Sequence, residues 1–268
     1  MKIVVFKGGL GNQIFEYAFC QYLKTLINEK IYVYYVPEKK AIQRRFEIMD
    51  FFDAKINKAH LIIKLVYWLI KVIKYMYKDS DLISTDDSYN INSICFDGWW
   101  QDKKYYENIN SWIQFKNLPL NDKNIETMNA IKNTESVSIH IRRGDYLFSQ
   151  FADIYTNICT PDYYRNAISM VKQKYKNPHF FVFSDDMDWV KENFELENAT
   201  YISWNVGIDS HWDMYLMSYC KVNIIANSSF SYWGAYLNKS NELTVYPQKW
   251  YNSGYEPPSI FPEKWYGI

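Results

Sequence analysis

Two adjacent arginines, Arg142 and Arg143, have the type and position expected of residues that bind an anion. They follow residues 136–141, where small or polar residues alternate with apolar ones, a pattern typical of a strand. Ligands of open α/β sheets bind just beyond the carboxyl ends of the strands. A guanidinium group carries five N–H donors in a planar fork that matches phosphate oxygens. The sequence therefore predicts a site for a phosphate-bearing ligand here.

The use of arginine at this position supports that interpretation. Only five of the chain's 30 basic residues are Arg, and two of the five stand here side by side. Arg142 is the residue we expect to stabilise a departing phosphate group, with Arg143 either assisting it or held in the fold. The alternative is a surface ion pair between this pair and Asp145, and the sequence leaves both interpretations open.

Polar side chains also end the apolar strand predicted at residues 179–184. Ser184 and Asp185 stand at its carboxyl end, where their oxygen atoms can accept hydrogen bonds from guanine N–H groups or from ribose hydroxyls. The alternative role for either residue is to cap the helix that follows.

A third group of polar residues follows the strand predicted at residues 221–226. Asn227, Ser228 and Ser229 open the next helix, just before Phe230. Hydroxyl groups together with first-turn amides can hold an anion. Capping alone would need only one of these side chains, so we expect this stretch to contact a ligand.

The N-terminal stretch combines a strand, a glycine-rich turn and a helix at residues 2–6, 7–11 and 12–27. Gly9 and Gly11 let the backbone approach a ligand closely, and Asn12 presents a polar head at the helix start. The third glycine of a dinucleotide-binding turn is missing, since residue 14 is Ile. A dinucleotide is therefore a poor fit, whereas another ligand is not excluded.

The remaining pattern is that of an α/β protein. A further strand is expected at 31–36, and from residue 136 onward strands and helices alternate, which predicts a parallel sheet covered on both faces. We therefore expect two Rossmann-like domains facing across a cleft, residues 1–133 and 134–268. Expected strands after residue 136 are 136–141, 179–184, 199–203, 221–226 and 243–246; expected helices are 161–175, 186–195, 211–219 and 229–238.

Composition excludes several classes of protein. The 268 residues have a formal net charge of zero, so no overall field attracts nucleic acid. The four cysteines are scattered without a C-x-x-C pair, which favours reduced thiols over disulfides or a zinc site. Because the sequence enters a strand directly at residues 2–6, we expect no secretory signal. These features predict a cytoplasmic protein.

Residues 61–78 form the most apolar stretch, interrupted by lysines at positions 64, 71, 74 and 78. At about 100° per residue these lysines fall within roughly 80° of a helix circumference, which predicts an amphipathic helix rather than a membrane span. The helix either packs on its own domain with the lysines in water or lies on the inner face of a membrane, and the sequence leaves both alternatives open.

Three motifs follow one another along almost the whole chain: Gly8-Gly9-Leu10-Gly11-Asn12-Gln13, His140-Ile141-Arg142-Arg143-Gly144-Asp145 and Asn227-Ser228-Ser229-Phe230-Ser231-Tyr232-Trp233-Gly234-Ala235. Together they resemble the motifs of the GDP-fucose-dependent fucosyltransferases, most closely those of the α-1,2-fucosyltransferase family. A fourth segment, Gly98-Trp99-Trp100-Gln101 with the following Lys-Tyr residues, is similar to another family segment, although Lys103 replaces a residue that is often acidic there. Its two tryptophans are either a sugar platform or part of the core.

The resemblance implies a GT-B architecture and transfer of L-fucose from GDP-β-L-fucose to the 2-hydroxyl of a galactose-type acceptor, with inversion. It places His140 beside the ribose or diphosphate, and the stretch from Asn227 to Phe230 at the diphosphate and fucose. GDP-fucose is then a substrate, and no cofactor is expected. For the base that removes the acceptor proton, Asp145 is the first choice, and Glu16 and Asp102 remain candidates.

Other interpretations remain. The chain could be a transferase of the same build that uses another sugar nucleotide, or a non-enzymatic glycan-binding module that uses its aromatic residues. It could also be a metal-dependent, single-domain transferase that uses Asp186 and Asp188. We expect no metal, because two guanidinium groups and a Ser-rich helix start already supply positive charge to a diphosphate.

Overall fold

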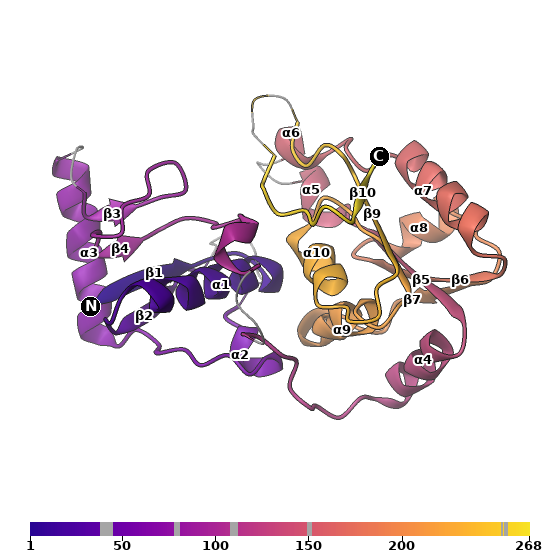
Figure 1. Cartoon of the computed structure of the whole chain (residues 1–268), viewed down its shortest axis with the longest axis horizontal. Coiled ribbons are helices and arrows are strands. Elements are labelled where there is room, and N and C mark those ends of the chain that lie inside the picture. The colour runs from indigo at the N-terminus through magenta and orange to yellow at the C-terminus, as the bar shows by residue number, and fades with distance from the viewer. Residues whose placement is uncertain (38–44, 78–80, 108–111, 149–151, 253, 255–256) are drawn as a thin grey trace. The chain divides into compact units, whose positions relative to one another are not determined.

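The computed structural model describes residues 1–37, 45–77, 81–107, 112–148, 152–252, 254 and 257–268. The chain divides into two compact units, an N-terminal unit, Met1–Asn117, and a C-terminal unit, Leu118–Ile268. Each unit is built on a parallel sheet with helices packed against it (Figure 1). The predicted fold class, α/β with two Rossmann-like units, is confirmed; the cleft between them stays a prediction.

The N-terminal unit has a four-stranded sheet in the order β2-β1-β4-β3. Helices α1 and α3 cover opposite faces of this sheet: Phe96 contacts Phe19 of α1, whereas its neighbour Cys95 packs in a cluster with Ile70 of α3. The elements of this unit are β1 (Lys2–Phe6), α1 (Leu10–Leu26), β2 (Ile31–Tyr35), α2 (Ile48–Phe51), α3 (Leu61–Met76), β3 (Ile83–Ser84), β4 (Cys95–Phe96) and η1 (Lys103–Tyr105).

The C-terminal unit has a six-stranded sheet in the order β10-β9-β8-β5-β6-β7. Helices α7 and α8 lie on one side of this sheet, and α9 and α10 on the other (Figure 1). Its elements are α4 (Asp122–Lys132), β5 (Glu135–Ile141), α5 (Gly144–Phe148), α6 (Ala152–Tyr155), α7 (Pro161–Lys174), β6 (Pro178–Ser184), α8 (Met187–Asn193), β7 (Ala199–Ile202), η2 (Gly207–Asp209), α9 (His211–Met217), β8 (Val222–Ile224), α10 (Ser229–Tyr236), β9 (Leu243–Tyr246) and β10 (Tyr266–Gly267).

Local chemistry explains the helix starts that the sequence predicted. Helix α7 begins where Thr160 accepts a hydrogen bond from the Tyr163 N–H at 3.3 Å and where Pro161 occupies the first helical position. Helix α10 begins where the Ser228 hydroxyl accepts from the Phe230 N–H, also at 3.3 Å. Every strand and helix predicted after residue 136 is found within a few residues of its expected bounds.

Two expectations differ from the structure. The division of the chain falls between Asn117 and Leu118 rather than at residues 133 and 134, because α4 packs against α9 and β5 of the C-terminal unit. The polar, turn-rich composition of residues 79–94 predicts a loop, but this stretch contains β3, which pairs with β4. Strands of two residues carry no alternation that a sequence pattern could reveal.

Other expectations can be checked briefly. All four cysteines are free thiols, as predicted. Within the described ranges, the chain has no helix with the length and hydropathy needed to span a membrane.

Candidate active site

The strand order of each sheet reverses at one point, and the predicted site residues gather at these two points. In the C-terminal unit, β6 and β7 continue on one side of β5, and the chain then returns to place β8 on the other side. In the N-terminal sheet, β2 lies on one side of β1, and β4 and β3 lie on the other side. In open α/β sheets, ligands bind beyond the carboxyl ends of the strands at such a switch point. The two candidate ligand-binding positions are therefore the loops after β5 and β8 and the loops after β1 and β4.

Both arginines that follow β5 are paired with carboxylates that follow the neighbouring strand β6. Arg142 Nη1 lies 3.0 Å from Asp185 Oδ2, and Arg143 Nε lies 3.2 Å from Asp186 Oδ2. Arg143 also lies over the Trp189 ring, 3.6 Å from its centroid, a close cation–π contact. Arg143 is thus held in the fold, which was one of the roles expected for it.

Asp185 braces the loop that carries the arginines. Its Oδ1 accepts a hydrogen bond from the Arg143 N–H at 2.9 Å, while its Oδ2 pairs with Arg142. The brace depends on Gly144, because a Cβ added there would lie 2.4 Å from Asp185 Oδ2. Sequence reasoning did not foresee this use of Asp185; its expected contact with guanine or ribose stays a prediction.

Ser184 and Asp186 act locally at the start of α8. The Ser184 hydroxyl accepts from the Asp186 N–H at 3.0 Å, and Asp186 accepts from the Trp189 N–H at 3.3 Å. The residue that caps α8 is therefore Asp186, and neither Ser184 nor Asp185 has the capping role that the sequence offered as an alternative. Asp186, the first carboxylate of the possible metal motif with Asp188, is already engaged by the helix and by Arg143. Among the described residues, no group of three His, Cys, Asp or Glu side chains is arranged to hold a metal ion.

His140 lies at the end of β5 and is 4% exposed. Its ring packs against Phe230 of α10, with centroids 5.8 Å apart, so it lies at the switch point between β5 and β8. Its Nδ1 is buried without a hydrogen-bond partner among the described residues. Burial, together with the positive charge of Arg142, lowers the pKa of His140 to about 3, so the ring is neutral at physiological pH. A ligand that bonded Nδ1 would satisfy an atom whose burial otherwise costs about 1–3 kcal/mol.

The fold already uses some of the side chains that were expected to contact a ligand at the start of α10. Asn227 is buried and its amide donates to the carbonyls of Tyr155 and Trp250, both at 3.2 Å. Ser228 caps α10 and is also buried. Ser229 and Phe230 are partly exposed. Two of the expected ligand contacts, Asn227 and Ser228, therefore have side chains already used by the fold, which leaves Ser229 and the helix start.

The side chain of Asp145 is outside the described part of the structure. Its backbone belongs to α5, immediately after the arginine loop. Tyr146 of the same helix donates to the Asn227 carbonyl at 2.9 Å, which joins the loop after β5 to the loop after β8. The expected base role of Asp145 stays a prediction.

At the N-terminal switch point, the glycine turn after β1 is tightly packed. Gly8 has a φ of 73°, in the left-handed region that favours glycine. A Cβ there would meet the Asn12 amide at 2.6 Å and the Trp99 ring at 3.3 Å. Gly9 precedes α1, Gly11 is buried inside it, and Asn12 accepts from the Gln101 amide at 3.3 Å. The turn thus brings Asn12, Gln101 and Trp99 together.

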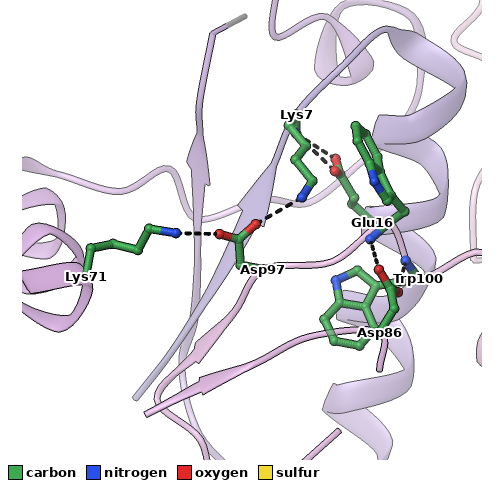
Figure 2. A network of polar contacts seen from close by, with 7 residues as sticks. Lys7, Glu16, Lys71, Asp86, Asp97 and Trp100 are labelled. Carbon is green, nitrogen blue, oxygen red and sulfur yellow. Dashed lines mark hydrogen bonds and ion pairs between the residues drawn. The ribbon is translucent and has the colours of Figure 1, made fainter. Parts of the chain in front are cut away.

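Charged residues surround this turn (Figure 2). Asp97, which follows β4, lies between the ammonium groups of Lys7 and Lys71, at 3.0 and 3.1 Å. Burial acts to raise the pKa of Asp97, but the two lysines hold it below its usual range. Glu16 of α1 is fully buried, and its two oxygens accept from the Lys7 N–H at 3.0 and 3.1 Å. Burial raises the pKa of Glu16 well above its usual value, despite these hydrogen bonds.

The two remaining base candidates therefore have structural roles. Glu16 holds the turn that follows β1. Asp102 caps η1, accepting from the Lys104 N–H at 3.0 Å, and pairs with the Lys104 ammonium group at 2.9 Å. Neither arrangement favours proton abstraction from an acceptor.

The tandem tryptophans have different environments. Trp100 is fully buried and stacked on Phe19, with centroids 3.8 Å apart. Trp99 is 37% exposed, and the Lys7 ammonium group lies 4.5 Å from its ring centroid. The Asp86 carboxylate fixes the backbone here by accepting hydrogen bonds from the backbone N–H groups of both tryptophans, each at 2.7 Å (Figure 2 labels Asp86 and Trp100). One tryptophan is thus part of the core, and the other faces solvent.

The chain is similar in sequence to known glycosyltransferases. The family model described as Glycosyl transferase family 11 matches residues 1–268. An alpha-1,2-colitosyltransferase of Escherichia coli is 39% identical over 166 residues, covering 59% of this chain and 57% of that protein. The O-antigen biosynthesis glycosyltransferase WbnK of Escherichia coli is 30% identical over 285 residues, covering 91% of this chain and 93% of that protein.

More distant similarities extend to an animal enzyme and a solved structure. Galactoside alpha-(1,2)-fucosyltransferase 1 of Aotus azarae is 29% identical over 140 residues, covering 49% of this chain and 38% of that protein. The crystal structure of NodZ alpha-1,6-fucosyltransferase soaked with GDP-fucose has a TM-score of 0.47 at 12% identity, covering 88% of this chain and 92% of that chain. Since the family model and WbnK both align with nearly the full sequence, the chain belongs to glycosyl transferase family 11.

Proposed function

We propose that this glycosyltransferase moves L-fucose from GDP-β-L-fucose to the 2-hydroxyl of a galactose-type acceptor, with inversion at the anomeric carbon. One observation carries the proposal. The unpartnered ring nitrogen of His140 and the guanidinium group of Arg142 both lie at the carboxyl end of β5, at the switch point beside the start of α10. The α-1,2 linkage is supported by two relatives whose names specify it, the colitosyltransferase and the galactoside fucosyltransferase.

The proposed reaction is a direct displacement. The acceptor oxygen bonds to the anomeric carbon as the bond to the diphosphate breaks, so positive charge develops on the sugar ring and negative charge on GDP. Donors placed where this negative charge develops lower the barrier without reorganising during the step. Arg142 supplies such donors, and its five N–H groups allow it to bind phosphate while it keeps its bond to Asp185.

The neighbouring groups complete the donor site. His140 is neutral, so it can form a hydrogen bond with the ribose or diphosphate without adding charge. Ser229 and the start of α10 contribute a hydroxyl and the positive end of a helix dipole. Asp145 is the proposed base for the acceptor hydroxyl. GDP-fucose is a substrate in this scheme, and no cofactor takes part.

We assign the acceptor to the N-terminal switch point. Trp99 offers an exposed ring on which the apolar face of a galactose can lie. Asn12 and Gln101 stand beside the turn with side-chain amides suited to sugar hydroxyls. The proposal predicts that Trp99→Ala raises the acceptor KM more than the donor KM.

Transfer of colitose is the second candidate, favoured by the 39% identity to the colitosyltransferase. Colitose lacks the 3-hydroxyl of L-fucose. A site that forms a hydrogen bond with that hydroxyl would discriminate against the deoxy sugar by a factor of about 10⁴–10⁵. A site without such a bond would accept both donors at similar rates.

The test is to incubate the protein with a β-galactoside and with GDP-fucose or GDP-colitose, and to weigh the products by mass spectrometry. The proposal predicts a product heavier by one fucosyl residue. Product from GDP-colitose alone would replace the first candidate with the second. GDP binding measured by calorimetry distinguishes an inactive preparation from a glycan-binding module, which would bind the galactoside without the nucleotide.

A further inference from the structure

Helix α3 presents a continuous apolar face to solvent. At about 100° per residue, seven exposed apolar positions of α3 fall within roughly 140° of the helix circumference. No charged residue lies within that arc. The exposed side chains are Leu61 (72%), Ile62 (64%), Leu65 (58%), Trp68 (65%), Leu69 (53%), Tyr75 (87%) and Met76 (65%).

A narrower face of the same helix accounts for its packing. Ile63 and Ile70 are 3% and 4% exposed, and Val66 and Tyr67 pack beside Ile70 against the N-terminal sheet. The helix thus packs on its own unit, which was one of the two alternatives left open by the sequence, but only this narrow face makes the contact. The broad apolar face remains uncovered by the described residues of the chain.

The lysines of α3 form a flank between these two faces. Lys64, Lys71 and Lys74 fall within roughly 80° of the circumference, and α3 contains no acidic residue. Lys71 pairs with Asp97, which also binds Lys7, so this group of three charges retains one net positive charge. Trp68 and Tyr75 occupy the edge of the apolar face next to the lysines. Lysine and aromatic side chains at the border of an apolar face are typical of helices that lie in a membrane interface.

We propose that the apolar face of α3 docks on the surface of a membrane that contains anionic lipids. Its leucines would enter the boundary between headgroups and acyl chains, while Trp68, Tyr75 and the lysine flank would lie at headgroup level. A second copy of the chain fits this face less well. Three lysines border this face, and lysine is depleted in stable protein–protein interfaces.

The experiment is flotation of the full chain with vesicles of phosphatidylcholine, alone or mixed with an equal amount of phosphatidylglycerol. We expect binding to the anionic vesicles at low salt, and about a hundredfold weaker binding to the neutral ones, since each net positive charge of the flank contributes about fivefold near an anionic surface. Leu65→Glu combined with Leu69→Glu is expected to weaken binding more than about tenfold. Lys64→Gln is expected to weaken it about fivefold, since one lysine contributes about that factor near an anionic surface.

The matched control is Val206→Glu combined with Ile208→Glu, two apolar residues 69% and 66% exposed in the C-terminal unit. The control adds the same charge, so binding like that of the unmodified protein assigns the effect to α3. Circular dichroism verifies that each variant is folded. Protein that stays at the bottom with anionic vesicles overturns the proposal. So does a dimer in analytical ultracentrifugation that the Leu65→Glu, Leu69→Glu variant abolishes, because a second copy would then cover the face. Neither readout depends on the donor or acceptor.

Discussion

Arg142 and Arg143 are neighbours in sequence with different surroundings. Arg143 is fixed by Asp186 and the Trp189 ring, whereas Arg142 pairs with Asp185. If Arg142 stabilises the leaving diphosphate, Arg142→Lys keeps the charge and loses the planar fork. Loss of a donor that acts mainly in the transition state lowers turnover by about 10²–10³, and kcat for fucosyl transfer measures it.

Arg165→Lys is the matched control, because Arg165 is exposed on α7 and pairs only locally with Asp162 among the contacts described. It should leave kcat unchanged. Retention of more than half the turnover by Arg142→Lys, with loss of activity in Arg143→Lys, would reverse the roles of the two arginines.

Gly144 is the residue whose replacement tests the brace formed by Asp185. An alanine Cβ would lie 2.4 Å from Asp185 Oδ2, so Gly144→Ala must displace the carboxylate that holds Arg142. We expect a loss of about 1–3 kcal/mol in the free energy of unfolding, measured by urea denaturation, together with lower kcat. Asp185→Ala removes the clashing atom, so Gly144→Ala should be milder in that background. Equal effects in both backgrounds would contradict the view that Gly144→Ala acts by displacing the Asp185 carboxylate.

Among the elements, the turn between β1 and α1 depends on a buried carboxylate. Burial raises the pKa of Glu16 well above its usual value, so the folded protein binds the proton more tightly than the unfolded chain does. The stability that this gives is fully present below the usual pKa of Glu and is lost as pH rises through the raised pKa. Glu16→Gln does not titrate, so its free energy of unfolding relative to the unmodified protein should increase with pH.

Urea unfolding between about pH 4 and pH 8 measures this difference. Glu126→Gln, at an exposed position of α4, is the control and should show no such trend. A difference that stays constant with pH for Glu16→Gln would show that Glu16 titrates alike in both states.

The longer elements were predictable from the sequence because each carries its own signal. Strands such as β6 are continuous apolar runs, and α7 has both a Thr cap and a first-turn Pro. The two-residue strands β3 and β4 exist only through pairing with each other and with β1, so no local pattern marks them. Because β4 was not predicted, the position of Asp97 directly after it, at the switch point, was not predicted either.

The site was predictable in place and less so in detail. The arginine loop and the start of α10 do meet at one sheet edge, because both follow neighbouring parallel strands. Which polar groups the fold itself uses depends on contacts between distant residues: Asn227 with Trp250, and Asp185 with the arginine loop. The same holds for the tryptophans, since Trp100 is buried among aromatic rings that include Phe19 of α1 and Phe96 of β4. Such contacts leave no periodic trace in the sequence.

For the whole molecule, we expect catalysis without a metal ion. A guanidinium group and a helix start supply the positive charge that Mg²⁺ supplies to a diphosphate elsewhere, and both would compete for the same oxygens. Fucosyl transfer should therefore be unchanged in excess EDTA, with product formation followed over time. Activity abolished by EDTA and restored by Mg²⁺ or Mn²⁺ would contradict this expectation and the leaving-group role of Arg142.

We propose that the chain joins L-fucose to the 2-hydroxyl of galactose with inversion, and nuclear magnetic resonance of the purified product made from GDP-β-L-fucose and a β-galactoside tests this directly. We expect an α-anomeric fucosyl signal and a shift of the galactose C2 resonance that marks substitution there. A β-linked product, fucose at another hydroxyl, or a donor left intact with every β-galactoside would contradict it.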